Sequence, residues 1–226
     1  MFSASLGLAL ALIADSYVTE TVEGFTIKIE AKLASPIDPL WASVRQELST
    51  QLYRISHVVA DAPLAKLRKV TVWVHKEAPV TKCMAYHPSS KYLKEHQMNL
   101  DMAKGIEIGN AQAFVSWTYE QPWMVLHELA HAYHDQFLEG GFEHKPVKDI
   151  FVSATQSKTY NSILHWDGKP AKHYALTNQM EYFAEATEAY FGQNDFHPFV
   201  RAELMQFDPK GYELMNSIWG QAQKRL

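Results

Sequence analysis

Alternating apolar and polar positions predict several short β-strands in the first half of the chain. Residues 25–31 alternate in this way and are typical of a strand with one buried face. Three more segments are short, apolar and rich in β-branched or aromatic residues, and they cover residues 70–74, 84–87 and 105–109. Together these segments predict a small sheet.

A different spacing, in which apolar residues recur every three or four positions, predicts helices. Residues 39–59 carry aliphatic side chains at this spacing from Leu40 to Ile55, so one face of this helix belongs to the core. Further helices are predicted over residues 122–138, 178–192, 199–207 and 211–219. The resulting order is strand, helix, three strands and then helices, which predicts an α+β protein with a mostly helical C-terminal half.

The composition is that of a globular protein. With 226 residues, of which 47% are hydrophobic and 20% charged, residues 1–226 can form a single domain around a sizeable core. The net charge of −4, without a basic stripe, argues against nucleic acid as a partner. Cys83 is the single cysteine, which excludes an intrachain disulfide and a zinc site made of thiolates.

The N-terminus carries an apolar segment at residues 6–14. It resembles the core of a signal peptide, with Ala14 before a candidate cleavage point, but no lysine or arginine precedes it. It is too short to cross a membrane as a mature helix, so stable membrane insertion is not expected. Two alternatives stay open: residues 1–14 are a signal peptide of a secreted or periplasmic protein, or they form a first buried element of a cytoplasmic one.

Candidate chemistry enters with the segment HELAH, residues 127–131. On a helix, His127 and His131 lie roughly 5–6 Å apart at Cβ on one face, so both imidazoles can bind one metal ion. Glu128 lies about 100° from His127 around the helix and can reach a metal-bound water without being a ligand. Zinc lowers the pKa of that water to roughly 7, and Glu128 takes its proton as it attacks a polarised carbonyl. The segment predicts a zinc hydrolase.

The flanking residues indicate that this helix is buried. Pro122 suits a first helical position, Gly140 and Gly141 end the helix, and most other side chains in it are apolar. Buried polar groups cost on the order of a few kcal/mol each unless they are paired, and a metal ion satisfies both imidazoles. The alternative is a surface helix with chance histidines, in a chain that holds 11 of them.

Two histidines leave zinc one protein ligand short, and the helix predicted over residues 178–192 is the best source of a third. Glu181 and Glu185 share one face of it, with Glu188 one turn further along, and such a stack of acids needs a cation opposite. Glu188 is an alternative third ligand. His134 is a weaker alternative, because it lies about 4.5 Å along the helix axis from His131, and we interpret it as a residue of the packing or of the second ligand shell.

The two segments together resemble a known family. HELAH followed by EYFAEA, residues 181–186, is similar to the glutamate-zincins (gluzincins), and most closely to the catalytic domain of anthrax-lethal-factor-like metallopeptidases. The resemblance implies that Glu181 is the third zinc ligand and that Glu185 accepts a hydrogen bond from a ligand imidazole. It also implies that Tyr174, seven residues before Glu181, stabilises the oxyanion. The similarity extends over residues 105–192, with Tyr182 where the family has phenylalanine.

The resemblance also implies a fold and a mode of substrate binding. We expect a zincin-like metallopeptidase fold, in which a small mixed sheet packs on the HExxH helix. In such folds an edge strand pairs through its backbone with an extended peptide, a mode that gives affinity through main-chain hydrogen bonds. Residues 105–109 and residues 84–87 are both candidates for that strand.

The sequence therefore predicts a zinc metallopeptidase, an endopeptidase that acts on a peptide or protein substrate and needs Zn²⁺ as its cofactor. Two alternatives are a zinc-binding pseudo-enzyme or interaction module, and a non-peptide zinc amidohydrolase. The water-activating Glu128 favours catalysis, because a structural zinc site does not need it. His173 is either an aid to the oxyanion or solvated, and Asp135 either orients a ligand histidine or caps locally.

Overall fold

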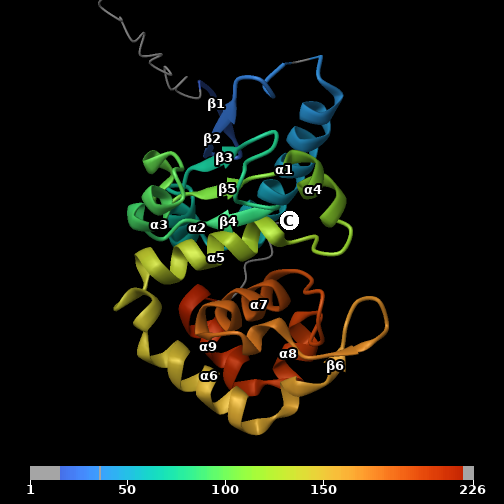
Figure 1. Ribbon diagram of the computed structural model, residues 1–226. Helices are drawn as coiled ribbons and strands as arrows, with labels where there is room; N and C mark the ends of the chain where they lie inside the picture. Colours follow the sequence, from blue (N-terminus) through green and yellow to red (C-terminus); the bar gives the residue numbers. More distant parts are fainter. Residues whose placement is uncertain (1–15, 36, 221–226) are drawn as a thin grey trace, which may run out of the picture.

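A mixed five-stranded sheet forms one half of the protein, and a group of helices forms the other (Figure 1). The computed structural model describes residues 16–35 and 37–220, so the apolar segment at residues 6–14 lies outside the described residues. In Figure 1 the sheet stands above helix α5 (Met124–Phe137), and the C-terminal helices lie below that helix. The predicted α+β class, with a small mixed sheet and a mostly helical C-terminal half, is confirmed.

The sheet has two antiparallel edges around a parallel centre. Its strand order is β1 (Tyr17–Val22), β2 (Phe25–Glu30), β3 (Val72–Val74), β5 (Ile106–Ile108) and β4 (Met84–Tyr86). β2, β3 and β5 run parallel, whereas β1 and β4 are antiparallel to their neighbours. All but β1 were predicted. β1 was missed because it is a largely exposed edge strand whose sequence, YVTETV, is mostly polar.

Helices cover the sheet and build the C-terminal half. Beside α5 they are α1 (Pro39–Val58), α2 (Asp61–Leu67), α3 (Ser90–Glu95), α4 (Ala111–Trp117), α6 (Lys145–Ser157), α7 (Gln179–Phe191), α8 (Arg201–Phe207) and α9 (Pro209–Trp219). Short 3₁₀ helices are η1 (Leu100–Met102), η2 (Gly141–Glu143), η3 (Thr159–Asn161) and η4 (Tyr174–Leu176), and a hairpin joins β6 (Ile163–Leu164) to β7 (Pro170–Ala171). The sequence predicted α1, α5, α7, α8 and α9. It missed the short helices α2, α3 and α4. It also missed α6, which buries only two residues fully.

The two faces of the sheet differ in what covers them. Alternation along a strand places Ile106 and Ile108 on the face that joins the main core. Glu107 lies between them and points to the opposite face, as does Trp73, its partner across the ladder. That second face is covered by the segment of α3 and η1, through Leu93 and other residues that pack on Trp73.

Two glycines bracket β5 because neighbouring chain segments come very close there. A Cβ built on Gly105 would lie 2.9 Å from the carbonyl oxygen of Thr71, and one built on Gly109 would lie 2.4 Å from the Cβ of Thr81. Neither position has room for a larger residue without a backbone shift. The segment that leads into β4 is therefore seated directly on the end of β5.

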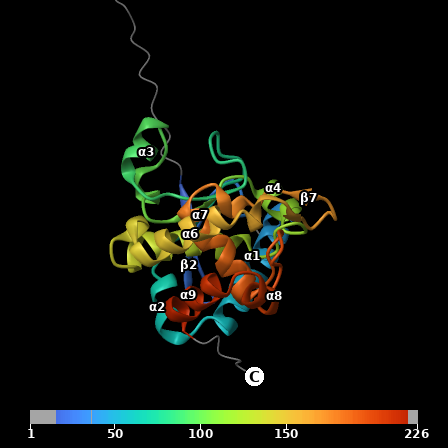
Figure 2. The same cartoon turned by 90° about the horizontal axis from the view of Figure 1, so that it is seen from below.

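One hydrophobic core extends through both halves of the molecule. It joins Phe25 and Ile27 of β2 to Leu126 of α5, Phe183 of α7 and Trp219 of α9. Figure 2 shows the C-terminal helices gathered over the middle of the molecule, while the α3 segment projects to one side. Within residues 16–35 and 37–220, no helix combines the length and apolar character needed to cross a membrane.

Candidate metal centre

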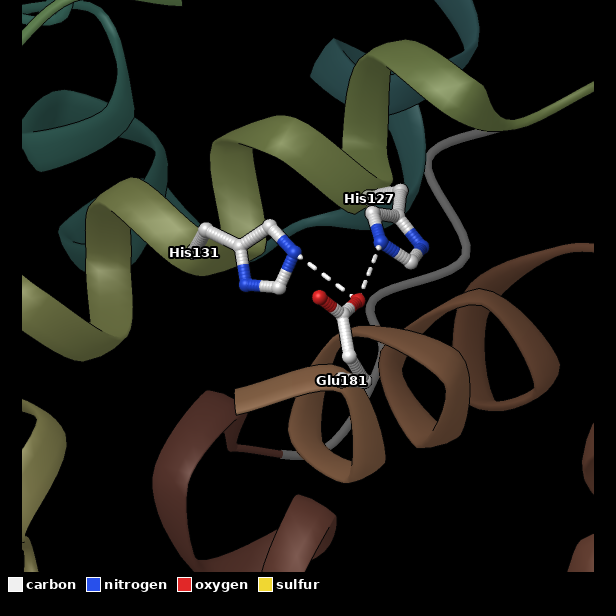
Figure 3. Close-up of side chains that lie close together, drawn as sticks. All are labelled: His127, His131 and Glu181. Carbon is white, nitrogen blue, oxygen red and sulfur yellow. Dashed lines mark hydrogen bonds and ion pairs between the residues drawn. The ribbon is translucent and has the colours of Figure 1, made fainter. Parts of the chain in front are cut away.

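Helices α5 and α7 pack against each other and bring three candidate ligands together (Figure 3). The Nε2 atom of His127 lies 3.1 Å from Oε2 of Glu181, and the Nε2 atom of His131 lies 3.2 Å from the same oxygen. The two imidazoles come from successive turns of α5, and Glu181 comes from the first turn of α7. Asn178 caps α7, since its side chain accepts hydrogen bonds from the backbone N–H groups of Met180 and Glu181.

The donor set fits a zinc ion. In a tetrahedral site with bonds of about 2.0–2.2 Å, neighbouring donor atoms lie roughly 3.3–3.5 Å apart, close to the separations of each imidazole from Glu181. The three donor atoms all lie within 4.8 Å of one another. Two neutral imidazoles and one carboxylate match the ligand chemistry that zinc accepts and leave a fourth position open. The three-ligand set predicted from the sequence therefore has its members in one place.

The electrostatics of this cluster favour a cation. Burial alone raises the pKa of Glu181, but hydrogen bonds from His127 and His131 outweigh it and hold the pKa well below its ordinary value. Burial lowers the pKa of His127, whereas the carboxylates of Glu181 and Glu188 raise it well above its ordinary value. The carboxylates thus hold positive charge between α5 and α7.

The other face of His127 is held by Glu188. The Oε1 atom of Glu188 lies 2.7 Å from Nδ1 of His127, whereas the nearest oxygen of Glu185 is 3.6 Å from that nitrogen. Glu185 is turned toward Asn194, whose Nδ2 donates to it at 2.9 Å, and burial and repulsion by Glu188 raise its pKa well above the ordinary value. The resemblance assigned the outer contact to Glu185, but Glu188 is the residue within hydrogen-bonding distance.

This geometry also bears on Glu188 as an alternative ligand. Glu188 contacts Nδ1 of His127, the nitrogen that faces away from the Nε2 atoms and Glu181. Among the residues that the structure describes, a second group of three donors consists of His127, Glu185 and Glu188, and it shares His127 with the first. Because a neutral imidazole binds a metal through one nitrogen, Glu188 suits the role of holding the ring and fixing its tautomer.

Glu128 is anchored by the edge strand of the sheet. Its Oε2 accepts a hydrogen bond of 2.8 Å from the backbone N–H of Tyr86 in β4. The spacing of the motif gave no sign of this contact, because the two residues are 42 positions apart. The buried thiol of Cys83 lies in the same region, where burial and the charge of Glu128 raise its pKa to about 12. A thiol with that pKa stays protonated and is no nucleophile at neutral pH.

Tyr174 lies at the mouth of the site. Its side chain is 48% exposed, and its ring centroid is 6.5 Å from that of His127. It begins η4, which His173 caps by accepting a hydrogen bond from the backbone N–H of Ala175. Burial lowers the pKa of His173 to about 3, with a smaller effect from His197. His173 is therefore buried rather than solvated, lies 3.7 Å from Oε2 of Glu185, and fixes the turn that carries Tyr174.

Two other residues of α5 were also considered from the sequence, His134 as a packing residue rather than a ligand and Asp135 with two alternatives. His134 is fully buried between the rings of Phe142 and Phe183, and burial lowers its pKa to about 3. Asp135 accepts hydrogen bonds from the hydroxyl of Tyr86 and from Nζ of Lys104, both at 2.6 Å. The Asp135 side chain thus ties α5 to Tyr86 of β4 and to Lys104, which precedes β5, and it has no hydrogen bond with either motif histidine.

Two cavities meet at Glu128. The first has a volume of about 320 Å³ and extends past His131; its apolar lining comes from Met84, Ala85, Tyr86, Pro88, Phe142 and Met180. The second has a volume of about 280 Å³ and extends on the side of Glu188; its lining includes Cys83, Trp117, Gln121, Met124 and Glu185. His127, Glu128 and Tyr174 line both. The candidate metal centre thus lies in the first cavity, beside the place where the second adjoins it.

The backbone of β4 borders the cleft formed by these adjoining cavities. In an antiparallel pair, residues alternate between hydrogen-bonded and non-hydrogen-bonded positions. His87 donates to Gly105, and Gly109 donates to Cys83, so Met84 and Tyr86 turn their backbone groups away from β5. One of these groups, the Tyr86 N–H, is taken by Glu128. The remaining groups of Met84 and Tyr86 lie at the open edge of the sheet.

A comparison with solved protein structures finds one that is similar to this chain. It is described as the structure of the PRO-PRO endopeptidase (PPEP-2) from Paenibacillus alvei, with a TM-score of 0.44 and 20% sequence identity. The similarity covers 76% of this chain and 89% of that chain. No protein-family model matches the chain, and no curated protein matches it.

Proposed function

We propose that the protein is a zinc-dependent peptidase, in which His127, His131 and Glu181 hold the metal and Glu128 is the general base. One observation carries the proposal. Three donor atoms of the right kind converge beside a carboxylate, Glu128, that lines two adjoining cavities. This combination is the one that hydrolytic zinc sites require, with three protein ligands and an open fourth position.

Each residue has a separable role in this reaction. A bound zinc ion would polarise the substrate carbonyl and lower the pKa of a water molecule. Glu128 would take the proton of the attacking water and pass it to the leaving amine nitrogen. The Tyr174 phenol, at the mouth of both cavities, would donate a hydrogen bond to the oxyanion. Glu188 would keep Nε2 of His127 directed at the metal by holding Nδ1.

A peptide is the substrate that best fits the border of the cleft. Of the two strands considered from the sequence, β5 has neighbours on both sides and cannot add a strand, whereas β4 is an edge. Met84 and Tyr86 offer backbone groups along the cleft to an extended chain. An extended peptide paired with β4 would run past Glu128 into both cavities, which supports cleavage within a chain. We propose with it that the chain is a single domain with a zincin-like fold and that it belongs to the gluzincins.

The test is a cleavage screen in which metal is the variable. The purified chain is incubated with a mixed peptide library, after treatment with a chelator and after zinc is restored, and products are identified by mass spectrometry. We expect cleavage that the chelator abolishes and stoichiometric zinc restores. Cleavage that persists in a fully metal-free sample would overturn the proposal.

Two other outcomes identify the alternatives from the sequence. Stoichiometric zinc binding without cleavage of any library member would make the chain a zinc-binding pseudo-enzyme or interaction module. Zinc-dependent hydrolysis of small amides without cleavage of peptides would make it an amidohydrolase. Either result would overturn the peptidase assignment and leave the metal ligands in place.

A further inference from the structure

Glu107 is a fully buried carboxylate in the interior strand β5, outside the candidate metal centre. Its side chain has 0% exposure, and it points to the face of the sheet opposite α5. A carboxylate in such a place is costly, on the order of several kcal/mol, unless its oxygens are paired. All of its partners among the described residues lie on neighbouring segments.

The two flanks of strand β4 are bound to one oxygen of Glu107. The hydroxyl of Thr81, before the strand, donates to Oε2 at 2.5 Å, and Nε2 of His87, directly after the strand, lies 2.8 Å from the same atom. The other oxygen lies 2.7 Å from Nδ1 of His75, which follows β3. Nε2 of His75 in turn lies 2.8 Å from the hydroxyl of Tyr17. Glu107 therefore links β4 at both ends to the fixed centre of the sheet.

Glu107 is ionised in this setting. Burial raises its pKa, but the close approach of His75 and the hydrogen bonds from His87 and Thr81 outweigh that effect and lower the pKa to about 2. An ionised carboxylate forms stronger hydrogen bonds than a neutral group would, so it holds the flanks of β4 tightly.

Strand β4 carries groups that take part in the proposed reaction, so its link to Glu107 bears on that reaction. The Tyr86 N–H donates to Glu128, and the Tyr86 hydroxyl donates to Asp135 one turn beyond His131. Met84 and Tyr86 also present the backbone groups that border the cleft. A shift of β4 would therefore move the base and the peptide-pairing edge together.

We propose that Glu107 is a positioning residue, which fixes the edge strand β4 so that Tyr86 holds Glu128 and the strand can pair with an extended peptide. The effect on catalysis rests on the proposed function, whereas the effect on the strand does not. A general stabilising role of Glu107 would affect the whole fold, whereas a positioning role predicts a change confined to β4 and to substrate binding.

The first test measures the strand itself. In Glu107→Gln, with zinc bound, we expect the amides of Ala85 and Tyr86 to exchange with solvent at least roughly tenfold faster than in the unaltered chain. The amides of Ile27 and Ile29 in β2 should keep their rates, which separates a local change from a global loss of stability. Unchanged exchange in β4, or equal acceleration in β2, would overturn the proposal.

A matched control comes from a second buried carboxylate of the sheet. Glu30 in β2 is 7% exposed and accepts a hydrogen bond of 2.9 Å from the backbone N–H of Lys76, but it has no contact with the flanks of β4. Glu30→Gln should leave exchange in β4 unchanged. If Glu107→Gln does not fold, Thr81→Val removes one flank contact alone and should accelerate the same two amides by a smaller factor.

The second test uses kinetics on a peptide that the unaltered chain cleaves. Glu107→Gln should raise KM roughly tenfold for peptides long enough to pair with β4 and lower kcat, while bound zinc stays at one per chain. A merely structural role would lower kcat by reducing the folded fraction and leave KM unchanged. If no peptide is cleaved by the unaltered chain, the proposed function fails, and the exchange experiment still decides the role of Glu107.

Discussion

At the scale of single residues, Glu188 and Glu185 allow a direct comparison between family resemblance and geometry. Glu188 Oε1 lies 2.7 Å from Nδ1 of His127, whereas Glu185 lies 3.6 Å from it. A carboxylate that holds a ligand imidazole typically contributes 10- to 100-fold in metal affinity. We expect Glu188→Gln to weaken zinc binding by roughly that factor, and Glu185→Gln to change it by less than about threefold. Titration against a competing chelator measures both, and the reverse order would restore the role to Glu185.

Tyr174 is the residue whose role depends most on the reaction itself. Removal of one oxyanion donor typically costs roughly 10²- to 10³-fold in kcat. Tyr174→Phe should therefore lower kcat by about that factor, while zinc content and KM stay unchanged, because the ring remains. Tyr119, an exposed tyrosine that lines neither cavity, provides a control as Tyr119→Phe. Full activity of Tyr174→Phe would remove Tyr174 from the mechanism.

At the scale of elements, the two ligand helices are locked together where one ends and the other begins. A Cβ built on Gly192, directly after α7, would lie 2.0 Å from Cε2 of Trp123, the residue directly before α5. The sequence predicts Pro122 at the first helical position, but α5 begins at Met124. The backbone N–H of His127 donates a hydrogen bond to the carbonyl of Trp123.

Gly192→Ala should push Trp123 away and separate the helices. Overpacking of this kind costs roughly 1–3 kcal/mol, which lowers the Tm of a chain of this size by several degrees. We expect weaker zinc binding as well, because His127 and Glu181 lie on the two helices concerned. Adding Trp123→Phe to Gly192→Ala should recover part of both losses, as calorimetry and zinc titration would show. Strictly additive losses would contradict the packing argument.

The lowered pKa of Glu107 predicts how the free energy of unfolding depends on pH. The pKa of Glu107 falls from its ordinary value of 4.5 to about 2, since the approach of His75 and the hydrogen bonds from His87 and Thr81 outweigh the opposing effect of burial. A carboxylate with a lowered pKa stabilises the fold above pH 4.5, and this contribution is lost as the pH falls from 4.5 toward 2. Its size is on the order of 3 kcal/mol.

The measurement is denaturant unfolding of the metal-free chain between pH 6 and pH 3. We expect the free energy of unfolding to fall with pH more steeply in the unaltered chain than in Glu107→Gln. Glu30 and Tyr17 line the same cavity and are unchanged in that variant, so their effects cancel in the comparison. Parallel profiles for the two proteins would contradict the assignment.

Elements with a local signal could be predicted from the sequence, and elements without one could not. α7 has the capping residue Asn178 and a glycine directly after it, α5 has an apolar period and two glycines shortly after its end, and α1 has its stripe from Leu40 to Ile55. β1 lacks such a signal, because it gains its place only by pairing with β2. The class of fold followed from local patterns, whereas the strand order depended on pairings between distant segments.

At the scale of the whole molecule, the candidate site divides in the same way. Spacing along α5 was enough to pair His127 with His131, because helix geometry places residues four apart on one face. The choice of Glu181 as the third ligand came from the family resemblance, since spacing along α7 left Glu188 open as well. The contacts of Glu128 with Tyr86 and of Glu107 with Thr81 join segments that are 42 and 26 residues apart, and no local pattern predicts them. Glu188 had a signal, since it lies seven residues after Glu181 on the same face.

The arrangement of the molecule gives each half one task. The sheet half supplies the edge strand β4, which fixes Glu128. The helical half supplies α7, which carries Glu181 and Glu188 and faces α5. In this account zinc joins the two halves through its ligands, so it should raise the Tm of the whole chain by linkage. Zinc binding and water activation are therefore assigned to different residues, and a substitution can remove one without the other.

Glu128→Gln tests that claim most directly when bound zinc and peptide hydrolysis are measured on the same sample. The variant keeps the size of the side chain and removes the base, and it leaves His127, His131 and Glu181 in place. We expect one zinc per chain in both proteins and a kcat lower by roughly 10²- to 10⁴-fold in the variant. A zinc-loaded Glu128→Gln protein with full peptidase activity would contradict the account.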